Sequence, residues 1–164
     1  MNIYFTGSHG TGKTTTAKLV AKKAKMCAPP SVSRNSPYKQ GSLEHQGYVM
    51  DKVYQRATDH KGSIHDRTPL DVYAYTLMME HEEEYGHQLM KVERFLSILE
   101  QTGEPLFYFP ITFPLVSDGT RPGKFEQIQI DTLIKPMIKD TSAIIYTMPE
   151  GTPEERANFV LERI

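Results

Sequence analysis

Eight residues near the amino terminus have the types and the spacing of a phosphate-binding loop. Residues 7–14 read GSHGTGKT and fit G-x-x-x-x-G-K-[ST] at every required position. Glycines let the backbone turn its N–H groups inward, and a helix that begins at Lys13 adds its positive end to the same hollow. Lys13 can reach the outer phosphates, and the Thr14 hydroxyl can ligate Mg²⁺. The pattern predicts a site for the polyphosphate of a purine nucleoside triphosphate.

A second pair of polar residues follows a short apolar run. Asp66 and Arg67 stand at the end of "SIHD", residues 63–66. A carboxylate at this point can hold Mg²⁺ or take a proton from a hydroxyl, and an arginine beside it can bind a phosphate through two parallel N–H donors. A surface ion pair would explain the two residues in isolation. Together with the phosphate loop, they favour a catalytic site that uses both.

These side chains need a scaffold that brings the ends of several strands together. Short apolar runs alternate with helix-forming segments, which indicates a parallel sheet covered on both faces. Ligands of such sheets bind beyond the carboxyl ends of the strands. The sequence therefore predicts one three-layer α/β domain over residues 1–164. We expect strands at 3–5, 31–33, 63–66, 106–109 and 142–147, and helices at about 13–28, 46–58, 69–85, 87–101, 124–139 and from 153 onward.

Composition narrows the classes of function. With 164 residues, 38% of them hydrophobic, the chain suits one domain with a core. A net charge of −1 lacks the basic balance expected of a polynucleotide-binding protein. The richest apolar run is broken by Pro110 and Pro114, so we expect no membrane span, and the strand-like start predicts no secretory signal. A lone Cys27 fits a reducing cytosol.

Four segments together resemble one family. The phosphate loop, "DRTPLD" at 66–71, "SDGTRPG" at 117–123 and "PEGTPEER" at 149–156 follow in the order found in P-loop nucleoside and nucleotide kinases. The chain is similar to the thymidylate-kinase and deoxynucleoside-kinase group, and most similar to the small kinases of bacteriophages. The resemblance implies a P-loop NTPase fold with a five-stranded parallel sheet and helices on both faces. It also implies an ATP- and Mg²⁺-dependent phosphotransferase.

The resemblance assigns roles on the donor side. Arg121 matches the arginine of a lid loop, at about 115–124, that closes over the ATP phosphates, although an exposed turn would also explain it. Pro149 and Gly151 match the loop that supports adenine, and a simple helix start explains them equally well. We expect catalytic roles for Lys13, Asp66, Arg67 and Arg121, and metal contacts from Thr14 and Asp66. The expected ATP-binding residues are Gly7, Ser8, His9, Gly10, Thr11, Gly12, Lys13, Thr14, Thr15, Arg121, Pro149 and Gly151.

The acceptor side is less sharply defined. Arg34 occupies a place where related kinases often put an arginine that touches the acceptor. Asp71 and Tyr75 are four residues apart on one helix and, with Arg67, can face a base or sugar. The aromatic residues of that helix can equally pack in the core. We expect Arg34, Arg67, Asp71 and Tyr75 to bind the acceptor.

The choice between a nucleoside and a nucleotide acceptor depends on chemistry. A sugar hydroxyl wants a carboxylate base, whereas a monophosphate is already ionised because its second pKa is about 6. Ser33-Arg34 stands where nucleoside kinases commonly have a glutamate, so we expect a (deoxy)nucleoside monophosphate. The alternatives are a nucleoside kinase, a kinase acting on a polynucleotide or a modified DNA base, and a non-catalytic nucleotide-binding regulator. We expect a cytoplasmic protein, in the host cytoplasm if a phage encodes it, and a possible homodimer.

Overall fold

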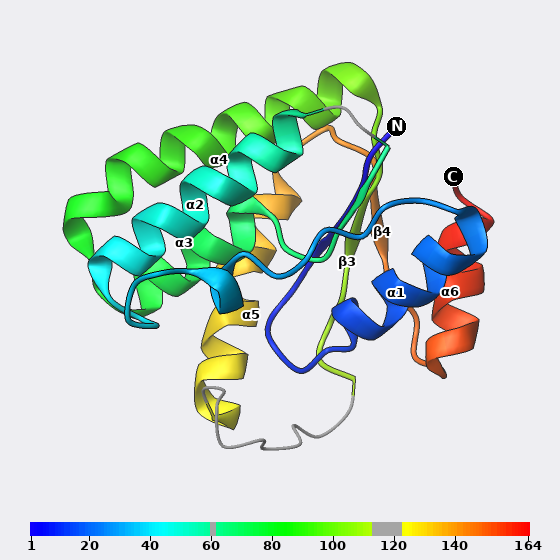
Figure 1. Ribbon diagram of the computed structural model, residues 1–164, viewed down its shortest axis with the longest axis horizontal. Helices are drawn as coiled ribbons and strands as arrows, with labels where there is room; N and C mark the ends of the chain where they lie inside the picture. The colour runs from blue at the N-terminus through cyan, green and yellow to red at the C-terminus, as the bar shows by residue number, and fades with distance from the viewer. Residues whose placement is uncertain (60–61, 113–122) are drawn as a thin grey trace.

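The computed structural model describes residues 1–59, 62–112 and 123–164. These residues form an α/β fold whose four parallel strands lie in the order β2-β1-β3-β4, with helices on both faces (Figure 1). The predicted α/β fold with a parallel sheet and helices on both faces is therefore confirmed, but the sheet of the described residues has four strands and not the five expected. The strands are β1 (Ile3–Thr6), β2 (Ile64–His65), β3 (Leu106–Tyr108) and β4 (Ile145–Thr147). The α-helices are α1 (Lys13–Ala24), α2 (Leu43–Thr58), α3 (Pro69–Met78), α4 (Glu82–Thr102), α5 (Lys124–Lys139) and α6 (Pro153–Leu161).

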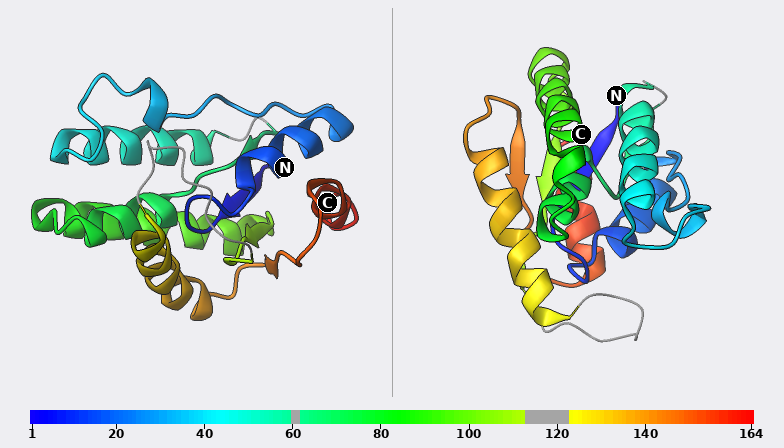
Figure 2. Two further views of the ribbon diagram at one scale, coloured as in Figure 1. Left: turned by 90° about the horizontal axis from the view of Figure 1, so that it is seen from below. Right: turned by 90° about the vertical axis from the view of Figure 1, so that its left-hand side faces the viewer.

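The helices form two layers, one on each face of the sheet. Figures 1 and 2 show α1 and α6 packed together on one face of the sheet, and α2 to α5 on the other. Strand β1 lies between these layers, and its side chains alternate between them. Ile3 and Phe5 pack with α1 and α6, whereas Tyr4 packs with α2 and α4. Burial on both faces explains why β1 reads as a continuous apolar run.

The strand register brings two predicted motifs to one edge. Tyr4 pairs with His65 in a parallel ladder, so the chain leaves β1 and β2 at the same end of the sheet. Gly7 and Asp66 follow directly after these two strands. The parallel topology therefore places the phosphate loop beside the Asp66-Arg67 pair.

The strand predicted at 31–33 was wrong. Residues 33–35 form a short 3₁₀-helix, η1 (Ser33–Asn35), and the pairing with the sheet occurs earlier, where Cys27 bridges Ser63. The Ile64 amide donates to the Cys27 carbonyl at 2.8 Å. Pro29 and Pro30 follow and carry no N–H group, so they cannot extend this ladder.

The helix predicted at 69–85 is two helices. The first ends at Met78, and Glu80 takes a left-handed conformation with φ of 57°. The amide of His81 then donates to the Thr76 carbonyl, which closes the end of α3. The acidic run that follows begins α4, where negative charges interact favourably with the helix N-terminus. In the described ranges, every helix is too short or too polar to cross a bilayer.

Candidate phosphate-binding and catalytic site

The first glycine of the loop is required by a close approach. Gly7 has φ of 137°, and a Cβ atom placed there would lie 2.5 Å from the carbonyl oxygen of Phe109. Since Phe109 directly follows β3, the loop leaves β1 tightly against the neighbouring strand end. A side chain at Gly7 would force the loop away from the sheet.

The last glycine sets the start of α1. Gly12 is the N-cap residue of α1 with φ of 91°, and the cap has no side-chain hydrogen bond. The first N–H groups of an α-helix lack partners within the helix, and together with the helix dipole they favour an anion. The loop therefore ends in a helix terminus suited to phosphate.

Lys13 extends over the loop that precedes it. Its Nζ donates to the carbonyl oxygens of Gly7 and Ser8, the latter at 2.6 Å. The ammonium group is thereby held above the hollow of the loop, where it can neutralise phosphate charge.

The hydroxyl and the carboxylate expected to hold a metal are hydrogen-bonded to each other. Thr14 Oγ1 donates to Asp66 Oδ2 at 2.8 Å, which joins α1 to the segment after β2. Among the described side chains there is no cluster of three or more His, Cys, Asp or Glu residues that could hold a metal. Mg²⁺ at nucleotide sites uses few protein oxygens, with phosphates and water completing its shell. Two hard oxygen donors beside a phosphate loop fit this ion.

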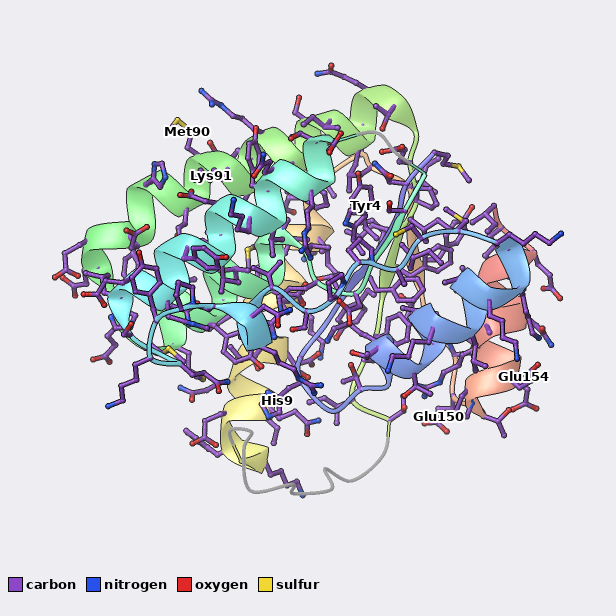
Figure 3. The ribbon with its side chains drawn as sticks, viewed as in Figure 1. Tyr4, His9, Met90, Lys91, Glu150 and Glu154 are labelled. Atoms are coloured by element: carbon purple, nitrogen blue, oxygen red, sulfur yellow. The ribbon has the colours of Figure 1, made fainter. Side chains whose placement is uncertain are left out.

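Arg67, Tyr75 and His9 form a series of contacts. The Arg67 guanidinium lies 5.6 Å from the centroid of the Tyr75 ring, and the Tyr75 hydroxyl is 2.7 Å from His9 Nδ1. Gln127 of α5 donates to the His9 carbonyl at 2.8 Å, and Figure 3 shows His9 at the loop tip beside the start of α5. Tyr75 thus connects the arginine to the phosphate loop and is only 9% exposed.

Asp71 does not share an open face with Tyr75. It is 2% exposed, and its two oxygens accept hydrogen bonds from Thr6, Gly7 and Thr68. The carboxylate is therefore occupied by protein donors, and the acceptor contact predicted for Asp71 stays a prediction that this geometry does not favour. The four-residue spacing identified a helix face correctly but could not reveal what covers it.

Arg34, which was predicted to bind the acceptor, is exposed. It belongs to η1, and the segment before it, residues 29–32, lines a small hollow of about 20 Å³ together with Asp66 and Arg67. The sequence analysis did not single out His45 of α2, because a lone histidine in a helix has no pattern that predicts its contacts. Its Nε2 is 3.2 Å from Ser33 Oγ, and burial, followed by the charge of Arg67, lowers its pKa.

A cavity of about 270 Å³ opens beside the phosphate loop. Gly151 and Pro153 line it, whereas Pro149 is exposed and is not part of the lining. Thr15 is at the wall, so the cavity is bounded by α1 and by the start of α6. The lining residues are Gly10, Gly12, Thr15, Thr16, Gly151, Pro153 and Arg156.

Arg156 of α6 was also missed. It is 3% exposed and donates to the Thr11 carbonyl at 2.9 Å and to Thr112 Oγ1 at 2.7 Å. This side chain supports the loop from behind and contributes a positive charge to the cavity wall. Its partner Thr11 is 145 residues away in sequence, so no local pattern could have indicated the contact.

Arg121 and most of the predicted loop at 115–124 lie outside the described residues. The described end of this loop contacts the site, since the Gly123 carbonyl is 3.4 Å from His9 Nε2. Gly123 is also the N-cap residue of α5.

Comparisons with known proteins show what this chain resembles. A family model described as an AAA domain matches residues 2–156. No curated protein matches the chain. A deoxyadenosine kinase from M. mycoides with bound dCTP is 15% identical, with 99% of this chain and 98% of that chain covered and a TM-score of 0.73. The same kinase with dCMP and a flexible dCDP bound is 13% identical to this chain. The match covers 99% of this chain and 97% of that chain, with a TM-score of 0.68.

A third solved structure gives a similar result. The YorR protein from Bacillus subtilis, in complex with phosphorylated GDP, is 12% identical, with 99% of this chain and 95% of that chain covered and a TM-score of 0.65. At such identities these likenesses show a shared fold over nearly the whole length of each chain.

Proposed function

The chain belongs to the AAA-domain family, and from this premise we propose that it is an ATP-dependent kinase of small nucleotides. The observation that carries the proposal is the Thr14–Asp66 hydrogen bond of 2.8 Å beside Lys13. It joins the phosphate loop to a carboxylate on the neighbouring strand end, which is the arrangement that P-loop phosphotransferases use. The likeness in fold to a deoxyadenosine kinase adds support.

On the donor side, each group has a defined task. The loop amides and Lys13 bind the outer phosphates and neutralise charge that develops in the transition state. Thr14 and Asp66 would hold Mg²⁺, and the ion would supply positive charge that stabilises the transferred phosphoryl group. The cavity beside Gly151 would receive the base of ATP. Arg121 remains the proposed arginine that covers the phosphates.

On the acceptor side, we propose a (deoxy)nucleoside monophosphate. The two carboxylates that follow β2 are both engaged: Asp66 accepts from Thr14, and Asp71 accepts from backbone and hydroxyl donors. A sugar hydroxyl needs a carboxylate base, whereas an ionised monophosphate needs cations such as Arg67 and Arg34. The deoxyadenosine kinase that shares this fold was solved with the products dCMP and dCDP bound; dCMP is the product of a nucleoside acceptor and dCDP that of a monophosphate acceptor, so this neighbour is compatible with both acceptor classes.

An ATP-consumption screen tests the proposal. The full chain is assayed with each deoxynucleoside and each deoxynucleoside monophosphate. We expect turnover with at least one monophosphate and a loss of about 100-fold or more in Lys13→Ala, because that lysine acts on the transferred phosphoryl group. Lys22→Ala, an exposed lysine of the same helix, is the matched control and should retain full activity.

The screen also separates the alternatives. Turnover with deoxynucleosides alone would favour a nucleoside kinase, which the likeness to a deoxyadenosine kinase makes the second candidate. ATP binding without transfer to any acceptor would contradict a small-molecule kinase. Normal transfer by Lys13→Ala would show that the active site lies elsewhere.

A further inference from the structure

One carboxylate joins the two segments that carry the proposed catalytic groups. Asp71 Oδ1 accepts from the Gly7 amide at 2.8 Å and from Thr6 Oγ1 at 3.2 Å. Its Oδ2 accepts from the Thr68 amide at 2.7 Å and from Thr68 Oγ1 at 2.9 Å. The first pair of donors belongs to the end of β1 and the start of the phosphate loop, and the second directly follows Asp66-Arg67.

Capping of α3 explains only half of these bonds. The chain contains a second capping box at α6, where Glu155 Oε2 accepts both from the Thr152 amide at 2.7 Å and from Thr152 Oγ1 at 2.8 Å. Glu155 is exposed and caps its helix through one oxygen. Asp71 makes the same two bonds and, while buried, sends its other oxygen to a segment 64 residues earlier. Its contact with Gly7 therefore serves something other than the cap.

The joined segments meet again at the proposed metal site. The phosphate loop runs from Gly7 to Thr14, and Asp66 lies two residues before Thr68. The Thr14–Asp66 bond of 2.8 Å depends on how these two segments are placed. We infer that Asp71 is a positioning residue, which sets the Thr14–Asp66 pair through Gly7 and Thr68 and does not contact substrate. This inference rests on the proposed function.

The substitution Asp71→Asn isolates this role. It keeps the shape of the side chain but replaces one oxygen by an NH₂ group. Because Gly7 and Thr68 both present backbone N–H donors to the two oxygens, an amide group must lose one of these bonds in either orientation. One of the two segments is then released while the rest of the fold is retained.

The test measures ATP binding with and without Mg²⁺. Calorimetry of the full chain with ATP, once with Mg²⁺ and once with EDTA, gives the factor by which the ion strengthens binding. We expect Asp66→Asn to abolish this factor and Asp71→Asn to reduce it by about tenfold, as partners of metal-ligating groups commonly do. Glu155→Gln, which alters a capping box without a second contact, should leave the factor unchanged.

The results test two statements separately: that Asp71 positions the Thr14–Asp66 pair, and that this pair binds Mg²⁺. An unchanged factor in Asp71→Asn, even with a lowered unfolding temperature, would overturn the inference and leave a purely structural cap. If Asp71→Asn does not fold, Thr6→Val removes one donor to Oδ1 and should also reduce the factor, by less than the reduction expected of Asp71→Asn. An unchanged factor there would also overturn the inference. Equal factors in wild type and Asp66→Asn would instead refute the proposed metal pair itself.

Discussion

At the scale of single residues, the folded structure lowers the pKa of His45. It is 3% exposed on α2 and lies beside Arg67 and Ser33. Burial and then the charge of Arg67 lower its pKa from 6.5, against a smaller opposing effect of the Tyr38 backbone. The imidazole is therefore neutral in the folded protein at pH values where the unfolded chain is already protonated.

This shift predicts a fall in stability on acidification. Below about pH 6.5 the unfolded state binds more protons at His45 than the folded state, so the free energy of unfolding decreases as the pH falls. Urea unfolding at pH 7.5, 6.5 and 5.5 measures the effect. His45→Gln should reduce this dependence, and the part that remains is expected from His65, whose pKa burial lowers to about 4. An equal slope in wild type and His45→Gln would contradict the prediction.

Residues within one local motif were predictable, and residues joined across the fold were not. Lys13 and Thr14 were predicted as site residues because their spacing reflects a backbone shape that few sequences can adopt. Asp66 followed from its position at a strand end. The hydrogen bonds of Asp71 could not be predicted, because helical spacing does not reveal which neighbours fill a face. The contacts of Arg156 could not be predicted, because its hydrogen-bond partners lie in loops far away in sequence.

At the scale of elements, helix boundaries were the least predictable feature. The α5 helix was predicted at its observed bounds, because the composition changes clearly after Gly123 and again after Lys139. By contrast, the break between α3 and α4 contains no glycine or proline, and it depends on the left-handed Glu80. Tertiary packing decided this break, since α4 turns back to pack against α3 and α2.

The contact between α3 and α4 leads to a stability prediction. Thr76 Oγ1 donates to the Gln88 side chain at 2.8 Å, and both residues are fully buried. Thr76→Val keeps the volume but leaves the Gln88 oxygen without this donor, so we expect a loss of about 1–3 kcal/mol in the free energy of unfolding. Urea unfolding measures the loss.

The control for this prediction is a threonine outside the interface. Thr132 of α5 is exposed. Among the described residues, its hydroxyl donates a hydrogen bond to the Ile128 carbonyl of its own helix at 2.9 Å. Thr132→Val should change the free energy of unfolding by less than about 0.5 kcal/mol. Equal losses in the two variants would show that the Thr76–Gln88 bond contributes nothing specific.

At the scale of the whole molecule, the phosphate loop is tied to elements from the entire chain. Asp71 connects it to α3, Gln127 to α5 and Arg156 to α6, while α1 continues it directly. These helices lie on both faces of the sheet (Figure 1). A ligand held by the loop is therefore held by both layers, so unfolding of either layer should release it.

This coupling predicts that ATP with Mg²⁺ stabilises the protein as one unit. A ligand at about 100 times its Kd adds roughly 2.7 kcal/mol to the free energy of unfolding, which corresponds to an increase of roughly 5–11 °C in Tm for a chain of this length. Calorimetric scans should show one transition that moves as a whole in wild type and Lys22→Ala, and a smaller shift at the same ATP concentration in Lys13→Ala. If only part of the unfolding enthalpy moved to higher temperature, the two layers would unfold separately, and the loop would not couple them.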